Sequence, residues 1–403
     1  MKVTFNEFVD NGLYVAEYYL KKKFEDISIR DLENNIDLFA NHVHDFISCN
    51  KYKKIADMAF HNSSYTQVIN KELKDKYKEN ARLESIKAQF RLIFYNLGDQ
   101  EVCSICGEKH VKLIGVDEKY LSAVTRSLMP NLTANTFFNH TNNLKFLDVC
   151  PICLFLSMIS VLNMRKSGNL VLFNSEDADF MKELTANRQA QNERDIFNES
   201  LEENKGNTVT VQDQIRFFIS EKEWTDKSIT IYEINNSGQS QTYQDYILTE
   251  SNIRVFKKVC SEGFLNEFNR LNLFKLLIRD TLKYDYLKYL ADFRNEKLKC
   301  EIDFFEFIDK EVSVLKQDLR DTIKNFCEKI YKVSKKNDIN ELKSVIDLRA
   351  FEELILKYIE LYKDVKSEDL ITEDEFEMFM DYRNWIHIKN RMIFNFIALK
   401  EKI

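Results

Sequence analysis

Two pairs of cysteines carry the clearest chemical signal in this sequence of 403 residues. Cys103 and Cys106 form one C-x-x-C pair, and Cys150 and Cys153 form a second. Two such pairs can bring four thiolates around one ion, and four soft thiolate ligands favour a tetrahedral Zn²⁺. Because four protein ligands leave no open coordination position, the pattern predicts a structural zinc site rather than a catalytic one.

The residues beside the cysteines support this interpretation. Gly107 follows the first pair, where a tight backbone turn would aim amides at sulfur, and Pro151 stiffens the second pair. The 43 residues between the pairs, 107–149, exceed the spacing of small zinc ribbons and predict an insert that folds out from the metal. A histidine, His110 or His140, could replace one cysteine as a ligand.

Two other interpretations of the cysteines stay open. A thioredoxin-like redox site needs one C-x-x-C pair at a strand-to-helix turn, whereas this chain has two pairs. The pairs could also be inert core residues, although two pairs at this spacing make that less natural. The other four cysteines lie in apolar helical contexts and are expected to be core residues: Cys49, Cys260, Cys300 and Cys327.

Two further motifs suggest metal-dependent catalysis. His42-Val-His44-Asp45 contains the HD dipeptide of a class of hydrolases, but His42 and His44 would point to different faces of a helix. The segment Asn139-His140-Thr-Asn142-Asn143 is similar to part of a zinc-stapled HNH nuclease, which needs a second histidine that this stretch lacks. The sequence holds no Walker loop, G-x-G-x-x-G or G-x-S-x-G motif.

The elements that must position these residues divide the chain into three parts. Apolar residues at helical spacing predict an N-terminal helical region over residues 1–100, including one helix over Lys71–Tyr95. Residues 101–250 are expected to hold the zinc-binding and β-hairpin region. Residues 251–403, with one glycine and no proline, predict a C-terminal bundle of about five or six helices, one stripe of which runs from Phe264 to Ile278. The fold class expected is therefore mainly α with a smaller α+β region.

The middle region should contain the few strands of the protein. Strands are predicted at Val111–Val116 and Asn169–Phe173, and a hairpin from Ser228–Ile234 and Gln241–Leu248. The hairpin would turn through Asn235-Asn236-Ser237-Gly238, because Asn and Gly tolerate left-handed backbone. The polar stretch Asn187–Lys205 is expected to be a surface excursion or mobile loop.

Composition limits the functional classes. The formal net charge of −7 excludes a globally basic nucleic-acid binder, and the 8 glycines and 2 prolines argue against an all-β fold. Glu7, Asp10 and Glu17 interrupt the first twenty residues, so we expect no export signal, no membrane association and a cytoplasmic location.

Three stretches together resemble the CRISPR-associated CXXC–CXXC family, the large subunit (Cas-eight type) of type I-B Cascade surveillance complexes. The first is the opening segment Val3–Leu13, with its Asn-Gly step. The second is the two cysteine pairs, with Met129-Pro130-Asn131 and Phe137-Phe138 before the second pair. The third is Ile231–Gln239, which resembles a hairpin of the family although Asn235 replaces its usual serine.

The resemblance implies a subunit without catalytic activity. It would recognise a protospacer-adjacent motif in target double-stranded DNA, support R-loop formation, contact the backbone and handle-binding subunits and the guide RNA, and help to recruit a helicase–nuclease. Amides on loops would reach base edges and cations would meet phosphates. The candidates in residues 101–250 are Asn131, Asn135, Asn139, Asn142, Asn143, Lys145, Arg165, Lys166, Asn235, Asn236 and Gln239.

A basic face is a further expectation for the C-terminal bundle. Residues 251–300 and the last helix both carry more basic than acidic residues, which is compatible with ordinary solvated helix faces or with a phosphate-contacting stripe. The candidates for such a stripe are Lys257, Lys258, Arg270, Lys275 and Arg279. Two alternatives to the Cascade subunit stay open: a free-standing zinc nuclease, and a zinc-containing helical scaffold that binds only protein.

Overall fold

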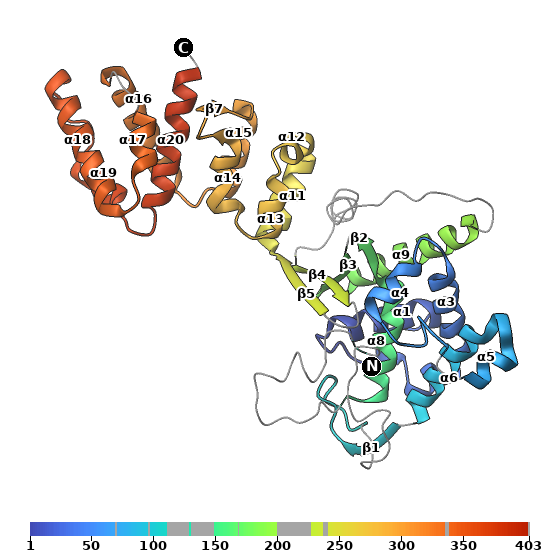
Figure 1. The fold of residues 1–403 in the computed structure, drawn as a ribbon. Helices are drawn as coiled ribbons and strands as arrows, with labels where there is room; N and C mark the ends of the chain where they lie inside the picture. Colours follow the sequence, from blue (N-terminus) through green and yellow to red (C-terminus); the bar gives the residue numbers. More distant parts are fainter. Residues whose placement is uncertain are drawn as a thin grey trace. The chain divides into compact units, whose positions relative to one another are not determined.

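A computed structural model describes residues 1–68, 71–95, 97–110, 129, 149–167, 169–199, 227–236, 241–334 and 338–401 (Figure 1). The chain divides into two compact units, Met1–Ile247 and Leu248–Ile403. Most described residues are helical, and the strands are few and short. The predicted fold class, mainly α with a smaller α+β part and a helical C-terminal part, is confirmed.

The first unit opens with helices whose apolar faces are buried, although Phe5, which was expected to belong to the first of these faces, is 76 % exposed. The Asn6 side chain caps α1 by accepting hydrogen bonds from the backbone amides of Phe8 and Val9. Phe39 and Phe46 of α3 are both fully buried. The elements before the first cysteine pair are α1 (Glu7–Leu20), η1 (Phe24–Asp26), α2 (Ile29–Asn34), α3 (Ile36–Ser48), α4 (Lys53–Ala59), α5 (Lys71–Tyr77), η2 (Lys78–Asn80), α6 (Ala81–Tyr95) and β1 (Leu97–Glu101).

The single helix predicted over Lys71–Tyr95 is wrong in one respect. Lys78 has a φ of 46°, in the left-handed region that a right-handed helix cannot include. The segment is therefore split into α5, η2 and α6. No glycine or proline marks this break, so the sequence pattern gave no signal for it.

The most apolar segment of the chain forms the central helix of the first unit. It comprises α8 (Pro151–Ile159) and the following turn η3 (Ser160–Asn163), and every residue in both is buried. The Phe155 ring packs edge-on against Phe39, Phe90 and Phe94, with ring centroids 5.5, 5.0 and 5.0 Å away. Helices α1, α3 and α6 thereby share one core with α8.

A four-stranded sheet completes this core, in the order β2-β3-β4-β5. Its strands are β2 (Arg165–Ser167), β3 (Asn169–Ser175), β4 (Ile229–Asn236) and β5 (Gln241–Leu248), so the predicted strand at Asn169–Phe173 and the two hairpin strands are confirmed. β3 pairs antiparallel with β2 and β4, with Leu172 opposite Tyr232. The predicted strand at Val111–Val116 lies outside the described residues.

The polar segment after β3 is a helix, which corrects the expectation of a surface loop over Asn187–Lys205. Helix α9 spans Ala178–Glu199. Arg188, Gln189 and Asn192 are buried on its inner face, where they donate to the carbonyl oxygens of Asn163 and Leu162 in η3. These hydrogen bonds offset part of the cost of burying polar side chains there. Residues 200–205 lie outside the described part.

The second unit is helical, with more and shorter helices than the five or six predicted. The expected stripe from Phe264 to Ile278 is divided, because Asn272 has a left-handed φ of 55° between two helices. The elements are α11 (Glu250–Ser261), α12 (Leu265–Arg270), α13 (Leu273–Ile278), α14 (Leu282–Leu290), β6 (Ala291–Asp292), β7 (Lys297–Leu298), α15 (Ile302–Val312), α16 (Gln317–Val333), α17 (Asp338–Ser344), α18 (Leu348–Lys366), α19 (Glu373–Phe379) and α20 (Trp385–Glu401).

A buried cluster around Asp309 ties four helices of this unit together: α14, α15, α16 and α20. Asp309 on α15 accepts hydrogen bonds from Arg391 on α20, Arg320 on α16 and the hydroxyl of Tyr286. Burial raises the pKa of Asp309, but the hydrogen bonds and charge of Arg391, the hydroxyl of Tyr286 and the charge of Arg320 together outweigh burial and hold that pKa below its ordinary value. Asp309 therefore stays ionised between two buried guanidinium groups.

Candidate metal centre

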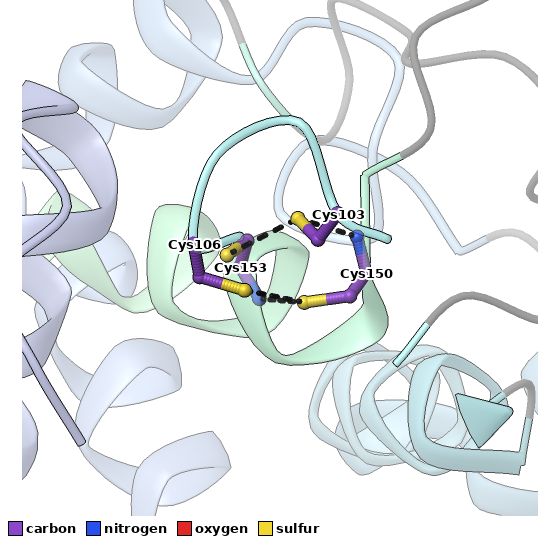
Figure 2. A group of neighbouring side chains, drawn as sticks. All are labelled: Cys103, Cys106, Cys150 and Cys153. Atoms are coloured by element: carbon purple, nitrogen blue, oxygen red, sulfur yellow. Dashed lines mark hydrogen bonds between the residues drawn. The ribbon is translucent and has the colours of Figure 1, made fainter. Parts of the chain in front are cut away.

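The four paired cysteines come together at the start of the central helix α8. Cys103 and Cys106 lie in the turn that follows β1, while Cys150 and Cys153 come from the N-cap and first turn of α8 (Figure 2). Their four Sγ atoms all lie within 4.8 Å of one another. The predicted four-cysteine cluster is thus present in the structure.

The sulfur separations are those of metal ligands. Cys103 Sγ lies 3.9 Å from Cys153 Sγ, and Cys106 Sγ lies 3.7 Å from Cys150 Sγ. A disulfide would need about 2.05 Å. With metal–sulfur bonds of about 2.3 Å, the edge of a regular tetrahedron is about 3.8 Å. The arrangement therefore leaves room for one ion at its centre.

The sulfurs are too close to ionise together without a cation. Hydrogen bonds from Cys106, Cys150 and Cys153 hold the pKa of the Cys103 thiol far below its ordinary value. The interaction with Cys103, followed by that with Cys106, raises the pKa of both Cys150 and Cys153. One thiolate can thus accept hydrogen bonds from the neighbouring thiols, whereas four thiolates in this mostly buried space require a positive ion between them.

Backbone amides point at the sulfurs as a metal knuckle requires. The amides of Ile105 and Cys150 donate to Cys103 Sγ at 3.4 and 3.2 Å. The Cys153 amide donates to Cys150 Sγ at 3.5 Å, so Cys150 is the N-cap of α8 and the helix dipole favours a thiolate there. Gly107 has a φ of +71°, which gives the expected tight turn a left-handed residue that glycine adopts without strain.

Close packing fixes the helix that carries the second pair. Gly12 on α1 lies directly against the backbone of Leu156 on α8. A Cβ added at Gly12 would come 2.9 Å from Leu156 Cα and closer still to its carbonyl oxygen. Only glycine lets α1 and α8 approach this closely, so the Asn-Gly step of the first helix sets the position of the helix that bears Cys150 and Cys153.

The cluster is closed. Cys103, Cys150 and Cys153 are at most 2 % exposed and Cys106 is half-buried, and around a bound ion four protein ligands would complete a tetrahedron without a position for water or substrate. It is the one group of three or more metal-ligating side chains found in the described part of the chain. His110 is not a member of it, and His140 lies outside the described residues. The arrangement can hold a structural metal.

The HD dipeptide takes part in ordinary packing. The His42 ring stacks on Tyr19 with 3.9 Å between centroids, and burial lowers the pKa of His42. His44 Nδ1 lies 3.5 Å from the neighbouring Asp45 carboxylate. Neither histidine belongs to a metal-ligating group within the described residues. Of the other cysteines, Cys49 and Cys327 are buried as expected, whereas Cys260 and Cys300 are half-buried.

The predicted nucleic-acid-binding residues of the middle region fall into three groups. Arg165 corrects the expectation: its side chain is buried and donates to the carbonyl oxygens of Leu162, Met164 and Arg188, so it holds the fold together. Lys166 on β2 and Asn235 on β4 are half-buried, and Asn236 ends β4. The remaining candidates lie outside the described residues: Asn131, Asn135, Asn139, Asn142, Asn143, Lys145 and Gln239.

The predicted basic stripe of the second unit is engaged in part within the protein. Lys258 pairs with Glu311 at 2.6 Å, and Arg270 pairs with Glu267. Lys257 is half-buried, while Lys275 and Arg279 are exposed. Two of the five cations thus already have carboxylate partners, which weakens the case for one continuous stripe.

The sequence did not predict a pocket at the C-terminal end of α1, where the run Lys21-Lys22-Lys23 was the available signal.

In comparisons with known proteins, no family model, no curated protein sequence and no solved structure matches this chain. No helix among the described residues combines the length and the apolar character needed to cross a membrane.

Proposed function

We propose that this chain is the large subunit of a type I CRISPR Cascade surveillance complex. In that role it recognises the protospacer-adjacent motif in target DNA, supports R-loop formation and helps to recruit a helicase–nuclease. It has no catalytic activity of its own. Its partners are the backbone and handle-binding subunits, the guide RNA and double-stranded target DNA.

The observation that carries this proposal is that the cysteine cluster holds the two ends of the insert next to each other. Cys106 Sγ and Cys150 Sγ are 3.7 Å apart, so the 43-residue insert between them starts and finishes at one point on a buried scaffold. Loops that leave a rigid base are common sites of recognition. The insert contains the amide-rich stretch around Asn142 and Asn143, the side-chain type that reads adenine edges.

Zinc is the metal that this donor set favours. Four thiolates at tetrahedral spacing suit Zn²⁺, which has no redox chemistry and accepts this geometry readily. Bound at Cys103, Cys106, Cys150 and Cys153, it would fix the turn after β1 to the start of α8. The resemblance of Val3–Leu13 and of the hairpin sequence to the family adds support that is independent of the cysteines.

The test is target binding by a reconstituted complex. The chain is assembled with the guide RNA and the subunits encoded beside it, and binding is measured by gel shift against duplexes with a randomised motif beside the guide-matched region. A selected short motif supports the proposal. Substituting alanine at Asn142, Asn143 and Lys145 together should reduce that selection, at about 1–3 kcal/mol per lost base contact, while guide RNA loading is unchanged.

A matched control replaces exposed residues of the same types elsewhere. Lys74→Ala combined with Asn80→Ala alters the surface of α5 and η2 and should leave motif selection intact. Failure to assemble with guide RNA would overturn the proposal. Cleavage of DNA by the purified chain with Mg²⁺ or Mn²⁺, lost in His140→Ala, would establish the HNH-type nuclease instead. Assembly with protein partners but no DNA contact in footprinting would establish a protein-binding scaffold.

A further inference from the structure

A pocket of about 410 Å³ lies between the end of α1 and the first half of α9. Four lysines, two tyrosines, one glutamate and one alanine line it: Tyr14, Glu17, Tyr18, Lys21, Lys22, Lys23, Lys182 and Ala186. The lining therefore carries four positive charges against one negative charge, in a chain whose formal net charge is −7. This local excess of positive charge has to be explained.

Internal ion pairs account for only part of that charge. Lys22 pairs with Asp31 at 2.6 Å, and Lys182 lies 3.4 Å from the Glu17 carboxylate. Lys21 and Lys23 are exposed and have no carboxylate partner in the described part of the chain. Two uncompensated ammonium groups thus border the pocket, and an ammonium group is well suited to a phosphate.

The backbone at Lys21 gives a second, independent observation. Lys21 is the C-cap of α1 and has a φ of 54°, the left-handed conformation that glycine or asparagine usually supplies at this position. Residues other than glycine and asparagine rarely adopt this conformation. Its ammonium group lies 3.9 Å from the centroid of the Tyr18 ring, so this cation lies beside a tyrosine of the pocket.

The tyrosines define what kind of phosphate compound fits. Tyr14 is buried and Tyr18 is half-buried, so together they give the pocket an apolar wall beside its cations. A bare phosphate ion needs no such wall, whereas a nucleotide has a sugar and a base to pack against it. The volume of the pocket is within the range of about 300–1,000 Å³ that is common for sites that bind small molecules and cofactors.

We propose that this pocket binds one nucleotide unit of a single-stranded nucleic acid, with its phosphate at Lys21 and Lys23 and its sugar or base against Tyr18. RNA and DNA share this phosphodiester chemistry. None of the residues that line the pocket is among those proposed to read target DNA. It is tested on the purified full chain without assembly partners, so its failure and that of the proposed function are distinguishable.

The decisive variant is Lys21→Gly. Glycine removes the cation and also relieves the left-handed backbone, so this variant should be at least as stable as the parent protein. Lys78→Gly is the matched control, because exposed Lys78 also has a left-handed φ of 46° but lies in η2, outside the pocket lining. The two substitutions make the same change in charge and the same change in backbone freedom.

Binding is measured by fluorescence anisotropy with labelled twelve-nucleotide oligo(dT) and oligo(U) over a range of salt concentrations. Lys21→Gly should weaken binding of at least one probe about five- to tenfold, and more when combined with Lys23→Ala. The slope of log affinity against log salt should fall by about 0.7 for each lost phosphate contact with a single strand. Lys78→Gly should match the parent protein in both respects. Tighter binding of oligo(U) or of oligo(dT) identifies RNA or DNA as the ligand.

Three results would overturn the proposal. One is the absence of saturable binding of both probes by the parent protein. Another is an equal effect of Lys21→Gly and Lys78→Gly, which would show a diffuse charge effect. The third is complete displacement of the probe by inorganic phosphate or by polyglutamate at matched ionic strength, because a bare anion or an acidic peptide would then be sufficient.

Discussion

At the scale of single residues, the four cysteines carry the firmest functional prediction. Cys153→Ser removes one sulfur from a buried tetrahedron and leaves three thiolates around the ion. Metal analysis of the parent protein should give about one zinc per chain, and the variant should give much less. Structural zinc sites contribute on the order of 10 kcal/mol to folding, comparable with the whole stability of a domain. The first unit of Cys153→Ser should therefore be unfolded or insoluble.

Cys260→Ser provides the control for this prediction. Cys260 is half-buried on α11 and lies outside the cluster, so its loss should leave the metal content unchanged. The prediction is contradicted if the parent protein binds no metal, or if Cys153→Ser retains both its zinc and its melting temperature.

Glu7 makes the stability of the first unit depend on pH. Burial raises the pKa of Glu7 to about 7, against an ordinary value of 4.5, and the Tyr243 hydroxyl donates to its carboxylate at 2.9 Å. The folded state holds this proton more tightly than the unfolded state does. Protonated Glu7 therefore contributes in full to the free energy of unfolding below about pH 4.5, and this contribution is lost as pH rises to about 7. The loss is on the order of 3 kcal/mol.

Glu7→Gln tests this dependence. Glutamine keeps a hydrogen-bond acceptor for Tyr243 but cannot ionise, so the free energy of unfolding should fall less between pH 5 and pH 8 than in the parent protein. At pH 8 the variant should be the more stable of the two. Urea unfolding at several pH values measures this, with Glu25→Gln, an exposed carboxylate, as the control. Parallel curves for Glu7→Gln and the parent protein would refute the prediction.

At the scale of secondary-structure elements, the contact between α1 and α8 positions the metal centre. Gly12→Ala places a methyl group into the backbone of Leu156, which cannot move away as a flexible side chain could. The cost should reach or exceed the usual 1–3 kcal/mol of overpacking, and zinc affinity should fall because α8 carries two ligands. Gly263→Ala is the matched substitution: nothing lies within 4 Å of the added Cβ, and only its φ of +79° opposes it.

Thermal unfolding and zinc-chelator competition measure both variants. Gly263→Ala should cost about 1–2 kcal/mol and leave zinc affinity unchanged. If Gly12→Ala is no more destabilising than Gly263→Ala, the two helices do not depend on this close approach.

The same scale shows why the sequence predicted some elements and not others. The cysteine pairs and the hairpin strands were predictable, because ligand spacing and period-two alternation depend on nearby residues. Helix α9 was not, because its polar inner face is stabilised by partners such as Leu162 and Asn163, which are adjacent only after folding. The breaks at Lys78 and Asn272 were missed because a left-handed residue other than glycine leaves no mark in the hydrophobic pattern.

The candidate site could likewise be predicted only in part. The donor set and its closed geometry follow from the spacing of Cys103, Cys106, Cys150 and Cys153. The burial of Arg165 does not, because its carbonyl partner Arg188 belongs to a helix that the sequence had suggested was a loop. The lysine pocket was equally hidden, since Lys182 joins Lys21–Lys23 only through the packing of α9 against α1.

At the scale of the whole molecule, the two compact units should lose structure independently. Each has its own core, with the metal centre in Met1–Ile247 and the Asp309 cluster in Leu248–Ile403. Asp309→Asn removes the negative charge that pairs with buried Arg320 and Arg391, which are 8 % and 6 % exposed. Breaking a buried ion pair in this way typically costs about 4 kcal/mol.

Hydrogen exchange with mass spectrometry of the full chain assigns that loss to one unit. In Asp309→Asn, peptides from α15, α16 and α20 should exchange faster, while peptides from α1 and α8 keep the protection of the parent protein. Zinc chelation should do the opposite, and the two effects should add when combined, because the sites share no partners. Asp364→Asn, an exposed carboxylate on α18, is the control and should change neither unit. Faster exchange of α1 and α8 in Asp309→Asn would instead mean that the two units unfold as one.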